Sequence, residues 1–89
     1  MIESDEFKTW LTENTDYSVK VVRDTVSRMK RADMLLEWNG EETYQFFLER
    51  CPEYQSLSVS VKSQLRRAVK WYMMFQEIAQ KDASKESAD

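Results

Sequence analysis

Glycine, proline, cysteine and histidine are almost absent from this sequence. Gly40 is its only glycine, Pro52 its only proline and Cys51 its only cysteine, and it contains no histidine. A β-sandwich or an α/β domain of 89 residues needs several tight turns, and these favour Gly, Asn or Pro. The scarcity of such residues therefore predicts an all-α fold. With 42% apolar residues, the chain can bury one modest core, which indicates a single domain.

The same absences narrow the possible chemistry. Without histidine the chain lacks the commonest general base and the usual serine and cysteine triads. A single cysteine allows no intramolecular disulfide, and we expect Cys51 to be a small apolar residue at a helix end. The acidic residues stand where helix N-termini favour negative charge, so no metal site is predicted. We expect that the chain is not an enzyme and that it has neither a catalytic residue nor a bound cofactor.

Long apolar runs are also missing. No segment approaches the length of a membrane span, and no basic stretch followed by an apolar run marks a targeting peptide at the N-terminus. The sequence therefore predicts a protein that is soluble, cytoplasmic and not associated with a membrane.

What the sequence does contain is four amphipathic segments with helical periodicity, at about 4–13, 19–37, 41–50 and 58–81. Ser4 and either Ser18 or Asp16 are candidate N-caps of the first two segments, and Asn39 and Glu42 have the spacing of a capping box. Strand is the competing prediction for 18–22, but the helical period continues beyond it. We expect one four-helix domain over 1–81 and a flexible charged tail over 82–89. The predicted shared core comprises Trp10, Leu11, Val22, Val26, Met29, Phe47, Leu48, Leu65, Ala68, Tyr72 and Phe75, with Tyr44 inward and Phe46 close to the inward face.

Charge is unevenly distributed along the chain. Residues 17–38 carry a net charge of +2 and residues 57–80 a net charge of +3, although the whole protein carries −3. On both predicted helices the cations form stripes beside the core positions. These stripes either contact a polyanion or an acidic partner, or they are ordinary solvated surfaces whose cations pair with nearby carboxylates.

Several segments resemble the SAM-like core-binding domain of phage integrases and other tyrosine recombinases. The matching segments are FKTWL at 7–11, YSVKVV at 17–22, SRMKR at 27–31, SVSV at 58–61 and QLRRAVKWYMMF at 64–75. The family pattern is an aromatic-x-x-Trp-Leu opening, a Tyr-Ser entry to a long helix, and an arginine-bearing last helix that ends in Tyr and Phe. The resemblance covers about residues 6–78 and implies a compact SAM-like fold.

The resemblance also implies a function in DNA recombination in a phage or mobile element. Core-binding domains grip duplex DNA, so it implies weak, phosphate-dominated DNA binding on one joint surface. That surface comprises Lys20, Arg23, Lys30, Arg31, Lys62, Arg66, Arg67 and Lys70. The family's Arg/His/Tyr active site lies in a second domain that this sequence does not cover, so we expect a non-catalytic module.

A second hypothesis belongs to another class of function. The chain is then a stand-alone interaction protein of phage or mobile-element type, acting as an adaptor or an inhibitor. Its contact surface is either acidic or a patch of Trp71, Met73 and Met74, because Met and Trp side chains are common at adaptable protein interfaces.

Overall fold

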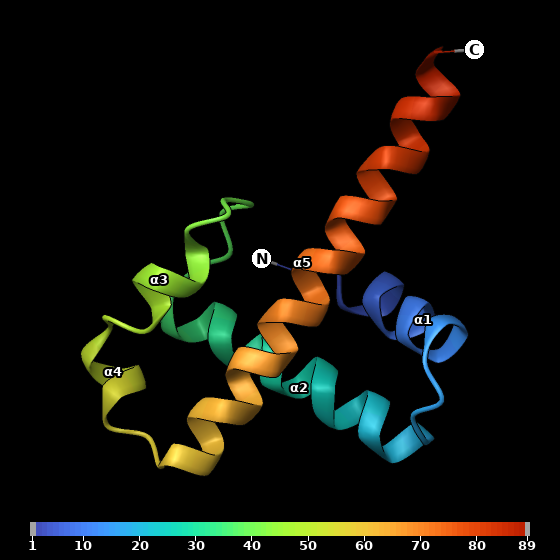
Figure 1. The fold of residues 1–89 in the computed structure, drawn as a ribbon. Helices are drawn as coiled ribbons and strands as arrows, with labels where there is room; N and C mark the ends of the chain where they lie inside the picture. The colour runs from blue at the N-terminus through green and yellow to red at the C-terminus, as the bar shows by residue number, and fades with distance from the viewer. Residues whose placement is uncertain (1, 89) are drawn as a thin grey trace.

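Five helices make up the part of the chain that the structure describes. The structure is a computed structural model that describes the backbone of residues 2–88 and the side chains of residues 2–78. Its helices are α1 (Ser4–Asn14), α2 (Val19–Leu35), α3 (Tyr44–Leu48), α4 (Pro52–Gln55) and α5 (Val59–Ala88). The long helix α5 crosses α2, with α1 on one side of it and α3 and α4 on the other (Figure 1). The predicted all-α class is confirmed, but residues 2–88 contain five helices and not the predicted four.

The core lies where α1, α2 and α5 meet. The Phe7 ring of α1 packs edge-on against Tyr72 of α5, with 5.0 Å between the ring centroids. Buried side chains at helical spacing supply the rest, namely Leu11, Val22, Val26, Met29, Ala32, Leu65, Ala68, Val69 and Phe75, and Tyr44, Leu48 and Tyr54 close one end. The predicted core is confirmed except at two positions: Trp10 is only partly buried at its edge, and Phe47 is exposed.

The N-terminal helix starts without the predicted cap. Ser4 is the first residue of α1, and Glu3 stands at the cap position without a side-chain hydrogen bond. Instead, the Glu3 backbone N–H donates to the Tyr72 hydroxyl at 2.9 Å. The start of α1 is therefore fixed by a contact with α5, which local sequence rules do not predict.

The second helix begins as predicted and ends two residues earlier than predicted. Ser18 Oγ accepts from the Val21 N–H at 3.3 Å, which is an N-cap bond. At the other end, the Tyr44 hydroxyl contacts the carbonyl oxygens of Ala32 and Leu36, and Asp33 Oδ1 accepts from the Trp38 N–H. These bonds satisfy backbone groups at the helix end and favour termination at Leu35.

The third predicted helix, at 41–50, is shorter than predicted, because α3 covers only Tyr44–Leu48, and a further short helix, α4, follows it at Pro52–Gln55. Asn39 Oδ1 accepts from the Glu41 N–H, two residues on, so it forms a turn and not the predicted capping box. Gly40 follows with φ +77°, a conformation that favours glycine. α3 ends at Leu48, before Pro52; the residue preceding Pro52, Cys51, is extended, and Pro52 itself occupies the first turn of α4.

The additional helix α4 changes which flank of α3 is buried. Tyr44 and Leu48, four residues apart, face the core, and Gln45 lies on the flank near Tyr54 of α4. Phe47 lies on the other flank, and Phe46 points away from the core. Because α4 supplies Tyr54 on the Gln45 flank, the predicted inward positions of Phe46 and Phe47 are wrong.

The last helix is longer than predicted. It extends from Val59 to Ala88, past the predicted end at 81, while the side chains from 79 onward lie outside the described residues. Flexibility of the segment 82–89 stays a prediction. In the described part of the chain, no helix has an apolar stretch long enough to cross a membrane.

Candidate functional site

The outer face of α5 carries a hollow lined by both cations and aromatic rings. Since Leu65, Ala68 and Tyr72 face the core, the side chains on the opposite side of this helix point to solvent. The hollow has a volume of about 560 Å³. It is lined by Tyr17 before α2 and by Ser63, Arg66, Arg67, Lys70, Trp71 and Met74 of α5.

Packing against two other rings holds Trp71 in place. Its ring centroid lies 6.0 Å from that of Trp10 and 5.9 Å from that of Tyr17, and both contacts are edge-on. Trp71 and Tyr17 are each partly exposed and line the hollow. Tyr17 is not among the site residues predicted from the sequence. Local rules pair a hydrophobic residue before an N-cap with the fourth residue of its own helix, here Val22, so they do not predict the contact between Tyr17 and Trp71 of α5.

The three cations of the hollow are not equivalent. Arg66 forms an ion pair with Glu49, and the hydrogen bond that its guanidinium donates to that carboxylate raises the pKa of the guanidinium. Arg66 also lies near Tyr54, whose pKa is raised mainly by burial and lowered in part by this cation. Within the described residues, no carboxylate pairs with Arg67 or Lys70, so both present their charge to solvent.

The other predicted cations lie elsewhere. Arg23 and Lys30 line a separate hollow of about 210 Å³ beside α1, together with Asp5 and Lys8. Lys20 and Arg31 are exposed on α2 but line neither hollow.

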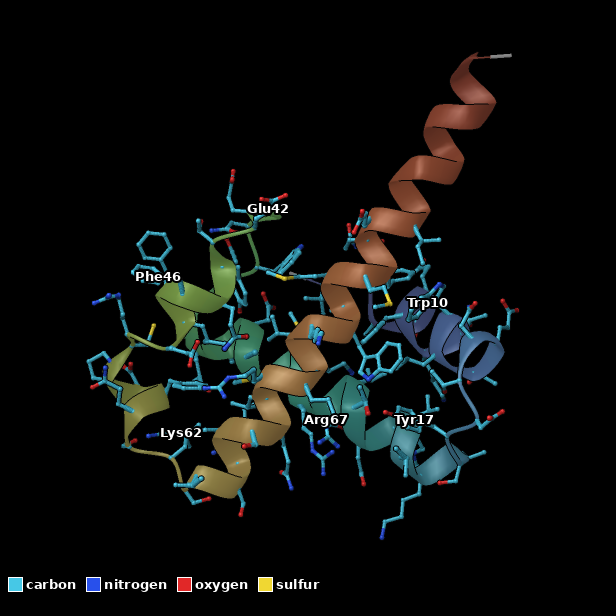
Figure 2. The ribbon with its side chains drawn as sticks, in the orientation of Figure 1. Trp10, Tyr17, Glu42, Phe46, Lys62 and Arg67 are labelled. Carbon is cyan, nitrogen blue, oxygen red and sulfur yellow. The ribbon has the colours of Figure 1, made fainter. Side chains whose placement is uncertain are left out.

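Lys62 lies near α4, where its carbonyl accepts from the Tyr54 hydroxyl at 3.1 Å. Figure 2 shows Lys62 on the α4 side of α5 and Arg67 on the side toward Tyr17. The structure brings Arg66, Arg67 and Lys70 together and does not add the cations of α2 to them, because α2 packs its apolar face on α5 and directs its polar face away.

The methionines and tryptophan of α5 are also divided between surfaces. Trp71 and Met74 line the hollow of α5 that holds Arg66, Arg67 and Lys70, called the basic hollow below, and Met74 is 41% exposed. Met73 lines a different hollow of about 360 Å³ with Trp38, Glu41 and Glu42. The sequence hypothesis of one contiguous patch of Trp71, Met73 and Met74 therefore corresponds to two surfaces of opposite charge.

A second exposed feature is an aromatic pair on α3. Phe46 and Phe47 are 53% and 51% exposed, and their ring centroids lie 5.4 Å apart. The Arg50 guanidinium lies over the Phe46 ring at 4.1 Å. Figure 2 shows Phe46 projecting away from the rest of the molecule. Because both rings are predicted in or near the core, this surface is not predicted from the sequence.

The groups at these surfaces are suited to binding. Arginine and lysine contact phosphate oxygens, and aromatic rings contact flat apolar groups.

The Cys51 thiol is partly buried and contacts the Phe47 carbonyl at 3.6 Å. Over the residues that the structure describes, no three potential metal ligands cluster.

Comparison with known proteins adds no relative to this description. No protein family, no curated protein and no solved structure matches the chain.

Proposed function

We propose that this chain is a non-catalytic DNA-binding module that resembles the SAM-like core-binding domain of tyrosine recombinases. The observation that carries the proposal is the convergence of Arg66, Arg67 and Lys70 on one hollow of α5. Cations gathered on one helix face contact successive phosphates of a nucleic acid backbone, and binding is favoured by release of the counterions. The resemblance of the last helix, at 64–75, to the arginine-bearing helix of that family supports the same conclusion.

The binding mode is phosphate-dominated and weak. Three cations form the site, one of them already paired with Glu49, and the protein as a whole is acidic with a net charge of −3. An affinity in the non-specific range, about 10⁻⁴–10⁻⁶ M, follows for duplex DNA, with little sequence preference.

A charge-reversal experiment tests this proposal. The variant Arg67→Glu with Lys70→Glu removes the two cations of the hollow that no carboxylate of the described residues pairs with, and it leaves the Arg66–Glu49 pair intact. We expect it to abolish binding of a labelled duplex at about 50 mM salt, measured by fluorescence anisotropy. The matched control is Arg23→Glu with Lys30→Glu, which changes the net charge equally but alters the hollow beside α1.

The two variants separate a local site from a general effect of charge. Equal loss of binding in both variants would show that only the overall charge matters. Absence of binding by the unmodified protein would remove DNA from consideration. In both variants the helical circular dichroism spectrum should be unchanged, because Arg23, Lys30, Arg67 and Lys70 are all exposed.

The aromatic pair on α3 favours a second candidate function, that of an interaction protein. Two adjacent, half-exposed phenylalanines and an arginine form the kind of surface that protein interfaces bury. If no form of DNA binds, an adaptor or inhibitor role becomes the leading proposal. The test then measures binding of a protein partner to the unmodified chain and to the variant in which serine replaces Phe46 and Phe47. We expect the variant to lose this binding.

A further inference from the structure

The basic hollow of α5 contains groups that phosphate contact alone does not require. Tyr17 and Trp71 line it beside the cations, and its volume of about 560 Å³ lies within the range of small-ligand sites. A surface that binds only the DNA backbone needs cations and hydrogen-bond donors but no aromatic lining. The aromatic lining therefore indicates a flat, apolar group as part of the ligand.

The rings are positioned before any ligand arrives. Trp71 is held edge-on by Trp10 at 6.0 Å and by Tyr17 at 5.9 Å, and Trp10 in turn lies 5.9 Å from the buried Phe75. This chain of contacts ties the lining of the hollow to the core. A ring held in this way loses little conformational freedom on binding, which favours the interaction.

Paired and unpaired DNA differ in what they can offer these rings. In an intact duplex, each base face is covered by its neighbours in the stack, so only base edges and phosphates are accessible. An unpaired base can turn its face toward an aromatic side chain while its phosphates stay near cations. Arg67 and Lys70, which no carboxylate of the described residues pairs with, line the same hollow as the rings.

We infer that this hollow binds an unpaired DNA base, so that the module prefers single-stranded DNA to fully paired duplex. The inference rests on the proposed function, because it assigns the ligand of the same site. It makes a distinctive prediction, since duplex DNA has the higher charge density and phosphate contact alone favours the duplex.

The experiment compares a labelled single strand of about 12 nucleotides with the duplex of the same sequence, by fluorescence anisotropy at about 50 mM salt. We expect the single strand to bind about tenfold more tightly, as one base–aromatic stack provides. Tyr17→Leu should remove this preference, whereas Tyr17→Phe keeps the ring and should retain it. Phe46→Leu is the control, because it removes an exposed ring far along the chain from the hollow.

Variants of Tyr17 are preferred to variants of Trp71 because Tyr17 lies in the connection before α2 and its ring contacts Trp71, whereas Trp71 lies within α5 and also packs against Trp10. Thermal unfolding of each variant checks that the fold is intact. Equal affinity for the two DNA forms, or a preference that survives Tyr17→Leu in a folded protein, overturns the inference and leaves the proposed function standing. If neither form binds the unmodified chain, both the inference and the proposed function are wrong.

Discussion

Tyr44 closes the C-terminal end of α2 through its hydroxyl group. The hydroxyl lies 3.0 Å from the Ala32 carbonyl oxygen and also contacts that of Leu36, and the side chain is fully buried. Tyr44→Phe removes this donor and leaves helix-end carbonyls less well satisfied. We expect the free energy of unfolding to fall by about 1–2 kcal/mol, measured by urea denaturation. An unchanged midpoint would show that water replaces the hydroxyl.

Tyr44 also affects how the stability of the protein depends on pH in the alkaline range. Burial, and secondarily the nearby Asp33 and Cys51, raise the pKa of Tyr44 well above its usual value of 10.0. Above this pH the unfolded chain loses the tyrosine proton while the folded protein keeps it, so stability falls as the pH rises. Burial also raises the pKa values of Tyr54 and Tyr72, so part of this decline is theirs. Urea titrations between about pH 9 and 12 should show a shallower decline for Tyr44→Phe than for the unmodified protein.

Two phenylalanines give a direct test of which residues are in the core. Phe7 is fully buried against Tyr72 and Phe75, whereas Phe47 is 51% exposed. Phe7→Ala should lower the free energy of unfolding by about 3–5 kcal/mol. Phe47→Ala should change it by less than about 0.5 kcal/mol, as at an ordinary surface position. A large loss for Phe47→Ala, again by urea denaturation, would support the inward orientation expected from sequence.

At the scale of the element, the start of α2 depends on one hydroxyl. Ser18 Oγ accepts from the Val21 N–H, and the helix contains the β-branched residues Val19, Val21 and Val22, which have modest helix propensity. Ser18→Ala should therefore lower the free energy of unfolding by about 1 kcal/mol. Ser18→Asp restores an acceptor at the same place and should recover the stability, which distinguishes a cap from a packing contact.

The region between α2 and α5 shows how neighbouring elements shape one another. The sequence predicts a single helix over 41–50, because apolar residues recur there at helical spacing and Pro52 indicates where the helix ends. Instead, Pro52 occupies the first turn of α4, and α4 brings Tyr54 against the Gln45 flank of α3. The contact partner of α3 therefore decides which of its flanks is buried.

At the scale of the whole molecule, the arrangement of cations predicts how DNA binding depends on salt. The logarithm of the binding constant falls with the logarithm of the salt concentration in proportion to the number of phosphates contacted. Eight cations on one surface would give a slope of about −7 for duplex DNA, whereas the three at the hollow of α5 give about −3. Anisotropy titrations between about 50 and 200 mM salt measure this slope. A value near −7 would mean that the cations of α2 take part.

The sequence by itself determined the helical class and most of the core. Scarce glycine and proline, together with apolar residues at helical spacing, restricted the chain to helices, and the spacing identified Leu11, Val26 and Tyr72 as buried. These are local properties, because backbone preferences and the helical period act within a few residues. The cap at Ser18 belongs to the same group.

Tertiary structure alone decided what meets on the surface. Spacing placed Arg66, Arg67 and Lys70 on one helix, but it did not show that Glu49 of another segment pairs with Arg66 or that Tyr17 joins Trp71. It also did not show that Arg23 and Lys30 of α2 line a different hollow from the cations of α5. The physical reason is that helical period fixes the direction of a side chain only relative to its own axis. Where that direction leads depends on how the helices cross and on which neighbour covers each face.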